Sequence, residues 1–228
     1  MFVLPNKLGN SNHHRITIAM PRQPQRQVGT LAEASHGRSK KSAKFESDRL
    51  SFRSLQPSDA APSWTDWLND PAIAEGLGVA TRRLSTSELS RYIASFDQDR
   101  RNLIGIFEKR SGKLVGLLMV EIDRRHGNAN CHIVLGEKRL WGRRVAYEAG
   151  EALVHHCFKQ WDLEKVMFCP LADNAPAVAV CLAHNLHLEG ILREHRVRAS
   201  GERSDQLLFA ITRNDYERRL AARQGKIR

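Results

Sequence analysis

A strand that runs through a short basic turn into a long helix constrains the fold of this chain more than any other segment. Residues 130–135 read as a strand, and residues 142–160 carry an apolar stripe of helical period. The turn that joins them contains Gly136 and Gly142 together with three arginines. A helix that begins so soon after a strand predicts a mixed domain in which helices pack on a sheet.

The remaining pattern extends this unit into an α+β domain. A helix is predicted around residues 64–68, ending at Asn69-Asp70-Pro71, and another over residues 85–96, which open with a capping box. Glycine-containing turns join three successive strand-like runs, which predicts an antiparallel meander. We expect a mostly antiparallel sheet of about seven strands flanked by four helices. Besides 130–135, strands are expected at residues 49–55, 102–108, 114–122, 165–169, 191–197 and 206–211, and the last helix at 175–184.

Residues 1–44 differ from the rest of the chain in composition and charge. They hold eight Lys or Arg against one acidic residue, Glu33, and thus +7 of the net charge of +11. Because they lack a sustained apolar period, we expect a disordered basic tail, one domain over 45–217 and a charged extension over 218–228. The tail has two interpretations, a solubilising or over-extended N-terminus and an electrostatic arm for RNA, ribosomes or anionic surfaces. The first is favoured, so at most weak nucleic-acid binding is expected.

Hydropathy and cysteine spacing exclude several classes of protein. No run approaches the ~18–20 apolar residues that cross a bilayer, and the start lacks the apolar region of roughly 7–15 residues of a secretory signal. The four cysteines form no Cys-x-x-Cys pair and have no zinc-like spacing to histidine. We therefore expect a cytoplasmic protein with reduced thiols, no membrane partner and no metal.

The basic turn before the helix at 142–160 has the composition of an anion site. The first N–H groups of a helix lack internal partners and carry a partial positive charge. Arg139, Arg143 and Arg144 add cations at the same end, and an anion such as a pyrophosphate would offset them. Gly142 would let the backbone approach that anion closely. A solvated basic helix start without a ligand explains the same residues, and this motif alone favours neither interpretation.

Three segments, in the right order, resemble the GNAT superfamily of acetyltransferases, especially its Rim-type branch of ribosomal-protein alanine acetyltransferases. Relatives read Trp-Gly-x-Gly-x-Ala-x-Glu-Ala where this chain has residues 141–149. They read Asn, then Gly-Phe, then often Glu-Gly where it has Asn174, Asn185-Leu186 and Glu189-Gly190. Asn185 suits the left-handed helix end that glycine usually fills. The resembling segments are 48–60 with 67–71, 141–149 and 173–190.

The resemblance implies a GNAT fold in which acetyl-CoA binds where two central strands splay. The coenzyme's pantetheine arm would pair with the strand ending at Val134 and Leu135, and a backbone N–H near Val134 would polarise the thioester carbonyl. The amine would attack directly in a ternary complex. Arg144 departs from the family pattern, which has Gly or Ala there. The implied coenzyme-binding residues are Val134, Leu135, Arg139, Gly142, Arg143, Arg144, Val145 and Asn174.

The expected acid and base residues are missing. Cys181 stands seven residues after Asn174, where many relatives carry the Tyr that acts as general acid, and Cys169 stands where some carry a carboxylate base. Cys181 is a candidate weak acid or a packed apolar residue. His132 and Glu121 are candidate substitutes for the base, although a structural histidine and a solvated strand end are the favoured interpretations.

The sequence therefore predicts an acetyl-CoA-dependent N-acetyltransferase without a metal. Its acceptor would be a primary amine, either a protein N-terminus or a small amine such as an amino sugar. A catalytically silent GNAT-like module that binds CoA or a partner is the main alternative, because the acid and base residues are absent. An RNA- or ribosome-associating protein is a third hypothesis, through the tail, and a homodimer is a candidate assembly.

Overall fold

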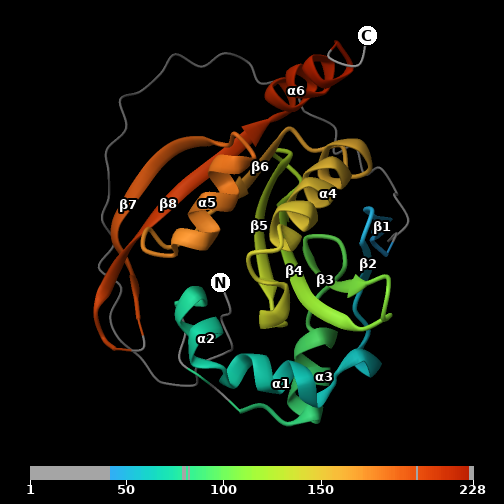
Figure 1. The fold of residues 1–228 in the computed structure, drawn as a ribbon, viewed down its shortest axis with the longest axis vertical. Coiled ribbons are helices and arrows are strands. Elements are labelled where there is room, and N and C mark those ends of the chain that lie inside the picture. The colour runs from blue at the N-terminus through green and yellow to red at the C-terminus, as the bar shows by residue number, and fades with distance from the viewer. Residues whose placement is uncertain (1–41, 79–80, 82, 199, 226–228) are drawn as a thin grey trace, which may run out of the picture. The chain divides into compact units, whose positions relative to one another are not determined.

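The central strands of the sheet are buried at almost every position, which requires a layer of helices on each face. The computed structural model describes residues 42–78, 81, 83–198 and 200–225. Figure 1 shows the sheet with its helices. The strands are β1 (Lys44–Glu46), β2 (Leu50–Ser54), β3 (Arg101–Glu108), β4 (Leu114–Asp123), β5 (Asn128–Leu135), β6 (Lys165–Phe168), β7 (His187–Val197) and β8 (Arg203–Thr212).

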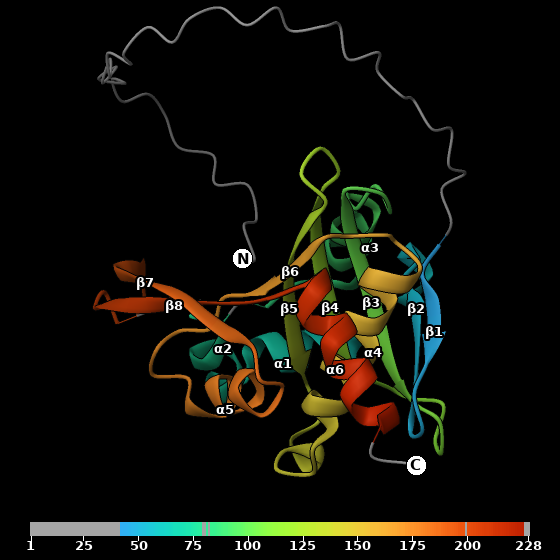
Figure 2. The ribbon, with the colours of Figure 1, turned by 90° about the horizontal axis from the view of Figure 1, so that it is seen from above.

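Six α-helices surround the sheet in the described part of the chain. Helix α4 packs on one face, where Ala149, Leu153 and Cys157 enter the core. On the other face, Trp67 of α1 lies against Gly136, and Tyr92 of α3 contacts Met119 (Figure 2). The helices are α1 (Pro62–Asn69), α2 (Pro71–Leu77), α3 (Thr86–Ala94), α4 (Val145–Lys159), α5 (Ala175–Ala183) and α6 (Arg213–Gly225).

The strand order divides the sheet into two arms. Strands β1 to β5 follow one another in sequence order, with every neighbouring pair antiparallel, so the predicted meander is confirmed. Strand β6 then pairs with β5 in parallel, and the order continues with β8 and β7. We call β1–β5 the meander arm and β6, β8 and β7 the C-terminal arm.

The two arms separate beyond Cys131↔Phe168, the last of four residue pairs between β5 and β6. Two features of the sequence end this ladder. Pro170 has no N–H to donate, and the carbonyl oxygen of Cys169 accepts a hydrogen bond of 2.7 Å from Gln206 Nε2. The last residues of β5, 132–135, therefore run on without a partner on β6, and we call this place the divergence.

Two local predictions made from the sequence are confirmed. Ser85 and Glu88 form the expected capping box at the start of α3, with bonds of 3.2 and 2.8 Å. Asn185 adopts a left-handed conformation (φ 50°) directly after α5, as expected from its role at the helix end. Sequence patterns with a specific side-chain mechanism thus located both helix termini correctly.

The numbers of strands and helices are higher than predicted. The described residues form eight strands rather than about seven, and six α-helices rather than four. Strand β1 has three residues and α2 has seven, so neither is long enough to show a period. Helix α6 is strongly charged and shows little apolar stripe. It docks on α4 through ion pairs with Glu151 and through the buried Tyr216, which stacks on Phe158, and sequence periodicity reports neither contact.

Strand β1 crosses the predicted boundary between tail and domain. Lys44 pairs with Arg53, and the buried Ala43 donates its N–H to Ser54 Oγ at 2.9 Å. Phe45 stacks on Phe52 with ring centroids 4.5 Å apart. The sheet therefore begins before residue 45, whereas the predicted disorder of residues 1–41 lies outside the described residues.

A protein that begins at Lys40 should keep the Tm of the full chain, whereas one that begins at Ser47 should melt lower. The second loses β1 and the half-buried Phe45, worth about 1.5–3 kcal/mol of apolar burial. At about 2–4 °C per kcal/mol, the difference in Tm between the two should be roughly 3–12 °C, measurable by calorimetry. An equal drop for the Lys40 start would show that residues 1–39 stabilise the domain.

The predicted charged extension over 218–228 belongs in large part to α6. Arg219 Nη2 and Arg223 Nη1 lie 2.7 and 2.6 Å from the carboxylate of Glu151 on α4. Burial alone would raise the pKa of Glu151, but a hydrogen bond from His184 and the two arginine charges hold the pKa down at about 2. The carboxylate is thus ionised at neutral pH and fastens α6 and α5 to α4.

Candidate functional site

The turn between β5 and α4 leaves the start of α4 without a side-chain cap. Asp70, Ser85 and Asn174 accept hydrogen bonds at the starts of α2, α3 and α5, whereas the side chain of Arg144 makes no such bond on α4. Gly142 (φ 71°) and Arg144 (φ 59°) are both left-handed, and the space beside Gly142 is open. The first N–H groups of α4 are therefore placed to receive an anion.

Arg139 is held away from this role by an ion pair. Its two Nη atoms lie 3.0 and 2.8 Å from the carboxylate of Glu108, at the end of β3. The hydrogen bond from Arg139 lowers the pKa of Glu108 to about 2. Lys138, the preceding residue, is bonded to Asp70 at the start of α2 at 2.6 Å. Lys138 and Arg139 thus join the turn to α2 and β3. Arg139, which the sequence predicted as an anion ligand, already has a carboxylate partner in Glu108.

Arg143 and Arg144 are the cations of the turn that face solvent. Both are exposed, and neither side chain has a carboxylate partner among the residues that the structure describes. The guanidinium of Arg144 lies 4.6 Å from the centroid of the Tyr147 ring, and this ring stacks on His184 at 4.0 Å. Two exposed cations at the positive end of α4 repel that end, so a bound anion would be stabilised there.

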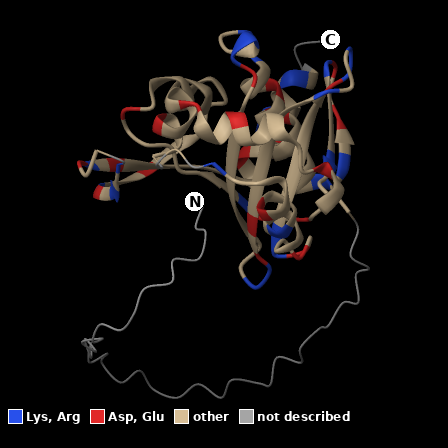
Figure 3. Ribbon diagram, turned by 90° about the horizontal axis from the view of Figure 1, so that it is seen from below, with Lys and Arg blue, Asp and Glu red and all other residues tan. Residues whose placement is uncertain are grey.

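Charged side chains elsewhere on the described part of the chain are mixed in sign. Figure 3 shows Lys and Arg interspersed with Asp and Glu over the sheet edges, the turns and α6. Many of them form ion pairs, such as Arg124–Asp99 and Arg213–Glu164. The Lys and Arg side chains of the described residues therefore form no broad basic surface. The turn before α4 is suited to an anion because of its own backbone conformation and arginines.

The hydrogen-bond pattern of β5 decides which backbone groups face the divergence. Gly136 donates to the Val115 carbonyl on β4 at 3.0 Å, and the register of these two strands is unbroken. Because antiparallel residues alternate between bonded and non-bonded pairs, the N–H of Val134 also turns toward β4. The N–H groups of Ile133 and Leu135 turn the opposite way. The N–H groups that face the divergence are therefore those of the two neighbours of Val134, whereas the sequence predicted a polarising group near Val134 itself.

Trp141 fastens the basic turn to the end of β5. Its indole N–H donates to the Leu135 carbonyl at 3.1 Å, while 43% of the residue stays exposed. This bond occupies the Leu135 carbonyl on the divergent side and leaves the N–H of the same residue directed there. The predicted binding residues Leu135, Gly142 and Val145 are thus brought together within one turn.

Asn174 lies across the divergence from this turn, at the start of α5. Its Oδ1 accepts from the Ala177 N–H at 3.1 Å, and its Nδ2 donates to the Gly76 carbonyl of α2 at 2.8 Å. The residue expected to contact a coenzyme therefore also caps one helix and holds the end of another. Because both polar atoms of the Asn174 amide are already bonded, these two bonds fix the orientation in which the amide would meet a ligand.

Cys181 is packed in the core. It is 5% exposed, and burial raises the pKa of its thiol to about 12. A thiol with so high a pKa is a poor proton donor to a departing thiolate, whose pKa is nearer 8–9. This position favours the packed-residue interpretation of Cys181 over the acid.

Cys181→Ala should therefore leave kcat within about twofold of wild type while lowering stability by about 1 kcal/mol, the usual cost of a small core truncation. Steady-state thiol release and thermal melting, measured on the same preparation, separate the two effects. Cys181→Ser is the matched control, since it keeps the size of the side chain. A fall of kcat by more than tenfold at an unchanged Tm would instead identify Cys181 as the acid.

His132 and Glu121 lie on the sheet face opposite α4. His132 pairs with Met119, and Glu121 pairs with Asn130, one step further along the same ladder. Burial, together with the positive charge of Arg196, lowers the pKa of His132 to about 3, so its imidazole is neutral at pH 7. Glu121 is half-buried. Of the two, Glu121 is the stronger candidate for holding an ammonium group, because a carboxylate side chain forms charge-assisted hydrogen bonds with ammonium donors.

Arg196 and Gln206 lie near the divergence, although sequence reasoning did not single them out. They come from β7, which is largely exposed, and from β8, and neither strand carries a motif that identifies them. The structure places them at the divergence, where Arg196 Nε donates to Gln206 Oε1 at 3.1 Å. Only the pairing of distant strands brings the two side chains to the end of β6.

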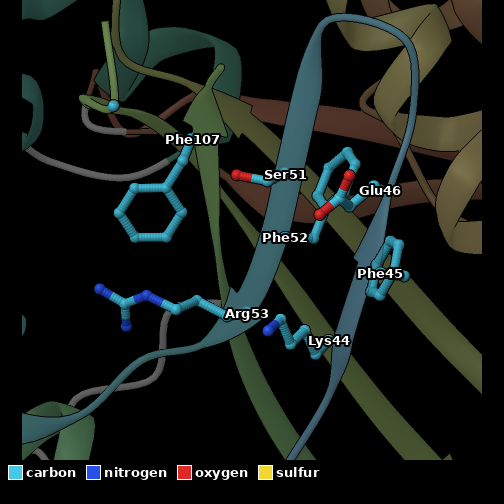
Figure 4. A pocket seen from close by; sticks show the side chains of 8 residues that line it. Lys44, Phe45, Glu46, Ser51, Phe52, Arg53 and Phe107 are labelled. Carbon is cyan, nitrogen blue, oxygen red and sulfur yellow. The ribbon is translucent and has the colours of Figure 1, made fainter.

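A separate hollow of about 330 Å³ lies on the β1–β2 edge, away from the divergence. Figure 4 shows Arg53, Lys44 and Phe107 among the side chains that line it. Arg53 is already paired with Asp59, at 2.6 and 2.7 Å, so the hollow offers little uncompensated charge. Within the described residues, no helix is long and apolar enough to span a membrane, and no cluster of His, Cys, Asp or Glu could hold a metal ion.

Comparisons with known proteins agree with this geometry. A family model described as "Acetyltransferase (GNAT) domain" matches residues 49–185. The chain is 22% identical over 173 residues to "Uncharacterized N-acetyltransferase p20" of Bacillus licheniformis, covering 74% of this chain and 96% of that protein.

Among solved structures, the fold is similar to spermidine N-acetyltransferase from Vibrio cholerae in complex with CoA and spermine. The TM-score is 0.67 at 20% identity, over 75% of this chain and 99% of the other. It is also similar to ribosomal-protein-S5-alanine acetyltransferase from Vibrio fischeri, with a TM-score of 0.62 at 14% identity, over 76% of this chain and 98% of the other. At these identities the two structures bear on the fold alone.

Proposed function

The chain belongs to the GNAT acetyltransferase family, and from this premise we propose that it is an acetyl-CoA-dependent N-acetyltransferase whose acceptor is a primary amine. The observation that carries the proposal is the start of α4. Its N–H groups have no side-chain cap, Gly142 leaves open space beside them, and Arg143 and Arg144 are exposed at the same end. This combination suits the pyrophosphate of CoA.

The divergence supplies the other half of the proposed site. The N–H groups of Ile133 and Leu135 turn away from β4 toward the place where β6 has separated. There they can pair with the amide groups of a pantetheine arm and polarise a thioester carbonyl. The amine nitrogen would attack that carbonyl carbon, the C–S bond would break, and the CoA thiolate would leave.

In this proposal the proton transfers are assigned to Glu121 and to solvent. The attacking amine must lose a proton, and the thiolate must gain one. Glu121, which is half-buried on the sheet face opposite α4, would hold the ammonium group and pass its proton to water. With Cys181 buried, the thiolate would take its proton from solvent. This chemistry needs no metal and supports a slow enzyme, because positioning and carbonyl polarisation still contribute.

The subfamily is part of the same proposal. The Rim-type motifs at residues 48–60, 67–71 and 141–149 support membership of that branch. A homodimer and a weakly nucleic-acid-binding tail remain proposals from the sequence. The principal alternative is a silent CoA-binding module, which the burial of Cys181 favours.

Two measurements test the proposal. Millimolar acetyl-CoA should raise the Tm of the protein, because a ligand that binds only the folded state stabilises it. A broad amine panel should then release CoA above the rate of spontaneous hydrolysis. An unchanged Tm would refute the coenzyme site. A raised Tm without thiol release from any amine would support the silent module instead.

A further inference from the structure

Helix α2 is bonded to both arms of the sheet. On the meander side, Asp70 at its start is paired with Lys138 of the basic turn at 2.6 Å. On the C-terminal side, the Gly76 carbonyl accepts from Asn174 at 2.8 Å, and Glu75 lies 3.6 Å from Arg198. The helix therefore connects the two sides of the divergence. An acceptor bound on the α2 side of the divergence would therefore lie against a helix that is fastened at both ends.

A positive charge is fixed at the divergence by a chain of hydrogen bonds. Arg196 Nε donates to Gln206 Oε1 at 3.1 Å, and Gln206 Nε2 donates to the Cys169 carbonyl at 2.7 Å. Gln206 is 6% exposed, so its amide cannot turn freely. Both ends of this buried amide are used, which orients the arginine relative to the end of β6.

The charge of Arg196 acts on both strands that border the divergence. It lowers the pKa of His132 on β5, where burial has the larger effect, and it opposes the burial that raises the pKa of the Cys169 thiol. Glu121 supplies a carboxylate on the same sheet face as His132. The described residues at the divergence thus include one oriented cation, which is a poor match for a polycation.

Resting on the proposed function, we propose that the acceptor is a small amine that also carries a carboxylate, and that Arg196 binds this carboxylate. Arginine suits the task, because its planar donors match the two oxygens of a carboxylate. Glu121, on the same sheet face as His132, is the carboxylate proposed above to hold the ammonium group. Among protein N-termini, only those that begin with Asp or Glu carry a carboxylate at a comparable distance from the amine, and a polyamine carries none.

The test compares acceptors that differ only in the carboxylate. Beta-alanine and 4-aminobutyrate are measured against their carboxamides, with spermidine as the polycation, and kcat/KM is expressed per unprotonated amine. We expect the wild-type enzyme to prefer each acid over its amide by at least about 30-fold, the range for a buried charged hydrogen bond left unmade. Equal rates for acid and amide, or a preference for spermidine, would overturn the proposal.

Variants assign the preference to one residue. Arg196→Met should lower kcat/KM for the acids to the level of the amides, while kcat/KM for the amides should stay within about twofold of wild type. Arg196→Lys should restore part of the preference for the acids. Arg193→Met, an exposed arginine on the same strand, is the matched control and should change nothing. An equal fall for acids and amides in Arg196→Met would show a structural role only.

Failure of the inference can be told apart from failure of the proposed function. Every variant is first checked for the rise of Tm with acetyl-CoA, which reports the coenzyme site alone. If wild type binds acetyl-CoA but acetylates no amine, binding is measured instead, as the further rise in Tm that each acid or amide produces with CoA present. No rise for either acid would overturn the carboxylate site, whereas a rise for the acids alone would support it.

Discussion

Gly142→Asp should weaken the binding of acetyl-CoA by at least about 100-fold and remove the rise in Tm that the ligand produces. The substitution places a side chain and a negative charge in the open space beside the uncapped start of α4. Each charge-assisted hydrogen bond lost there costs about 1.5–3 kcal/mol, and about 1.4 kcal/mol corresponds to a factor of ten in Kd. Isothermal titration with acetyl-CoA measures the change.

The chain contains a matched control for this substitution. Gly112 also has a left-handed backbone (φ 65°), and a Cβ added there would have nothing within 4 Å, but it lies in the turn between β3 and β4. Gly112→Asp should therefore carry the same conformational cost, about 1 kcal/mol, and bind acetyl-CoA normally. If both variants lose binding equally, general destabilisation explains the result. If neither does, the phosphate site is elsewhere.

Gly136→Ala should be among the most destabilising substitutions of a single methyl group in this protein. A Cβ at this position would lie 1.9 to 2.4 Å from three ring atoms of Trp67, which is 6% exposed. The β5 backbone is held in place by the bond from Gly136 to Val115, so the ring of α1 must move. Overpacking of this kind costs about 3 kcal/mol, equivalent to a fall in Tm of roughly 6–12 °C.

Gly190→Ala is the comparison, since the nearest atom to its added methyl group lies 3.8 Å away. Its Tm should match wild type within the error of the measurement. The double variant Gly136→Ala with Trp67→Leu makes room for the methyl group, so it should be more stable than the sum of its single variants implies. Strict additivity in this cycle would contradict the contact between Gly136 and Trp67.

The fold was predictable where local pattern and long-range packing agree. The capping box of Ser85 and Glu88 marks the start of α3, and the apolar stripe along α4 is long enough to define a helical period. The turns of the meander contain glycines. Strand β1 is short and α6 is charged on most sides. Strand β1 pairs with residues 51–53 of β2, which are close in sequence, but its three residues are too few to define a period. Helix α6 is held by Glu151, 68 residues from Arg219, and no local window contains that contact.

The candidate site was predictable only in part. The composition of the turn identified Gly142, Arg143 and Arg144, because a helix start with glycine and clustered cations is a local property. Arg139 looks the same in sequence, and its partner Glu108 is separated from it by 31 residues. Arg196 and Gln206 lie ten residues apart on the two strands of one hairpin, and a register shift between Leu192 and Arg196 adjoins the contact, so regular strand spacing does not reveal it.

The narrow junction between the two arms has a consequence for the order in which the protein opens. Four residue pairs join β5 to β6, the contacts of Glu151 with α5 and α6 form a second attachment, and the bonds of α2 to Lys138 and Asn174 form a third. The meander, built from sequence neighbours, can retain its hydrogen bonds while the C-terminal arm detaches. Backbone amides of β6, β7 and β8 should therefore exchange with deuterium through a partial opening. A ligand held at the divergence would slow exchange most at the amides of β6, β7 and β8 and least at those of β3 and β4.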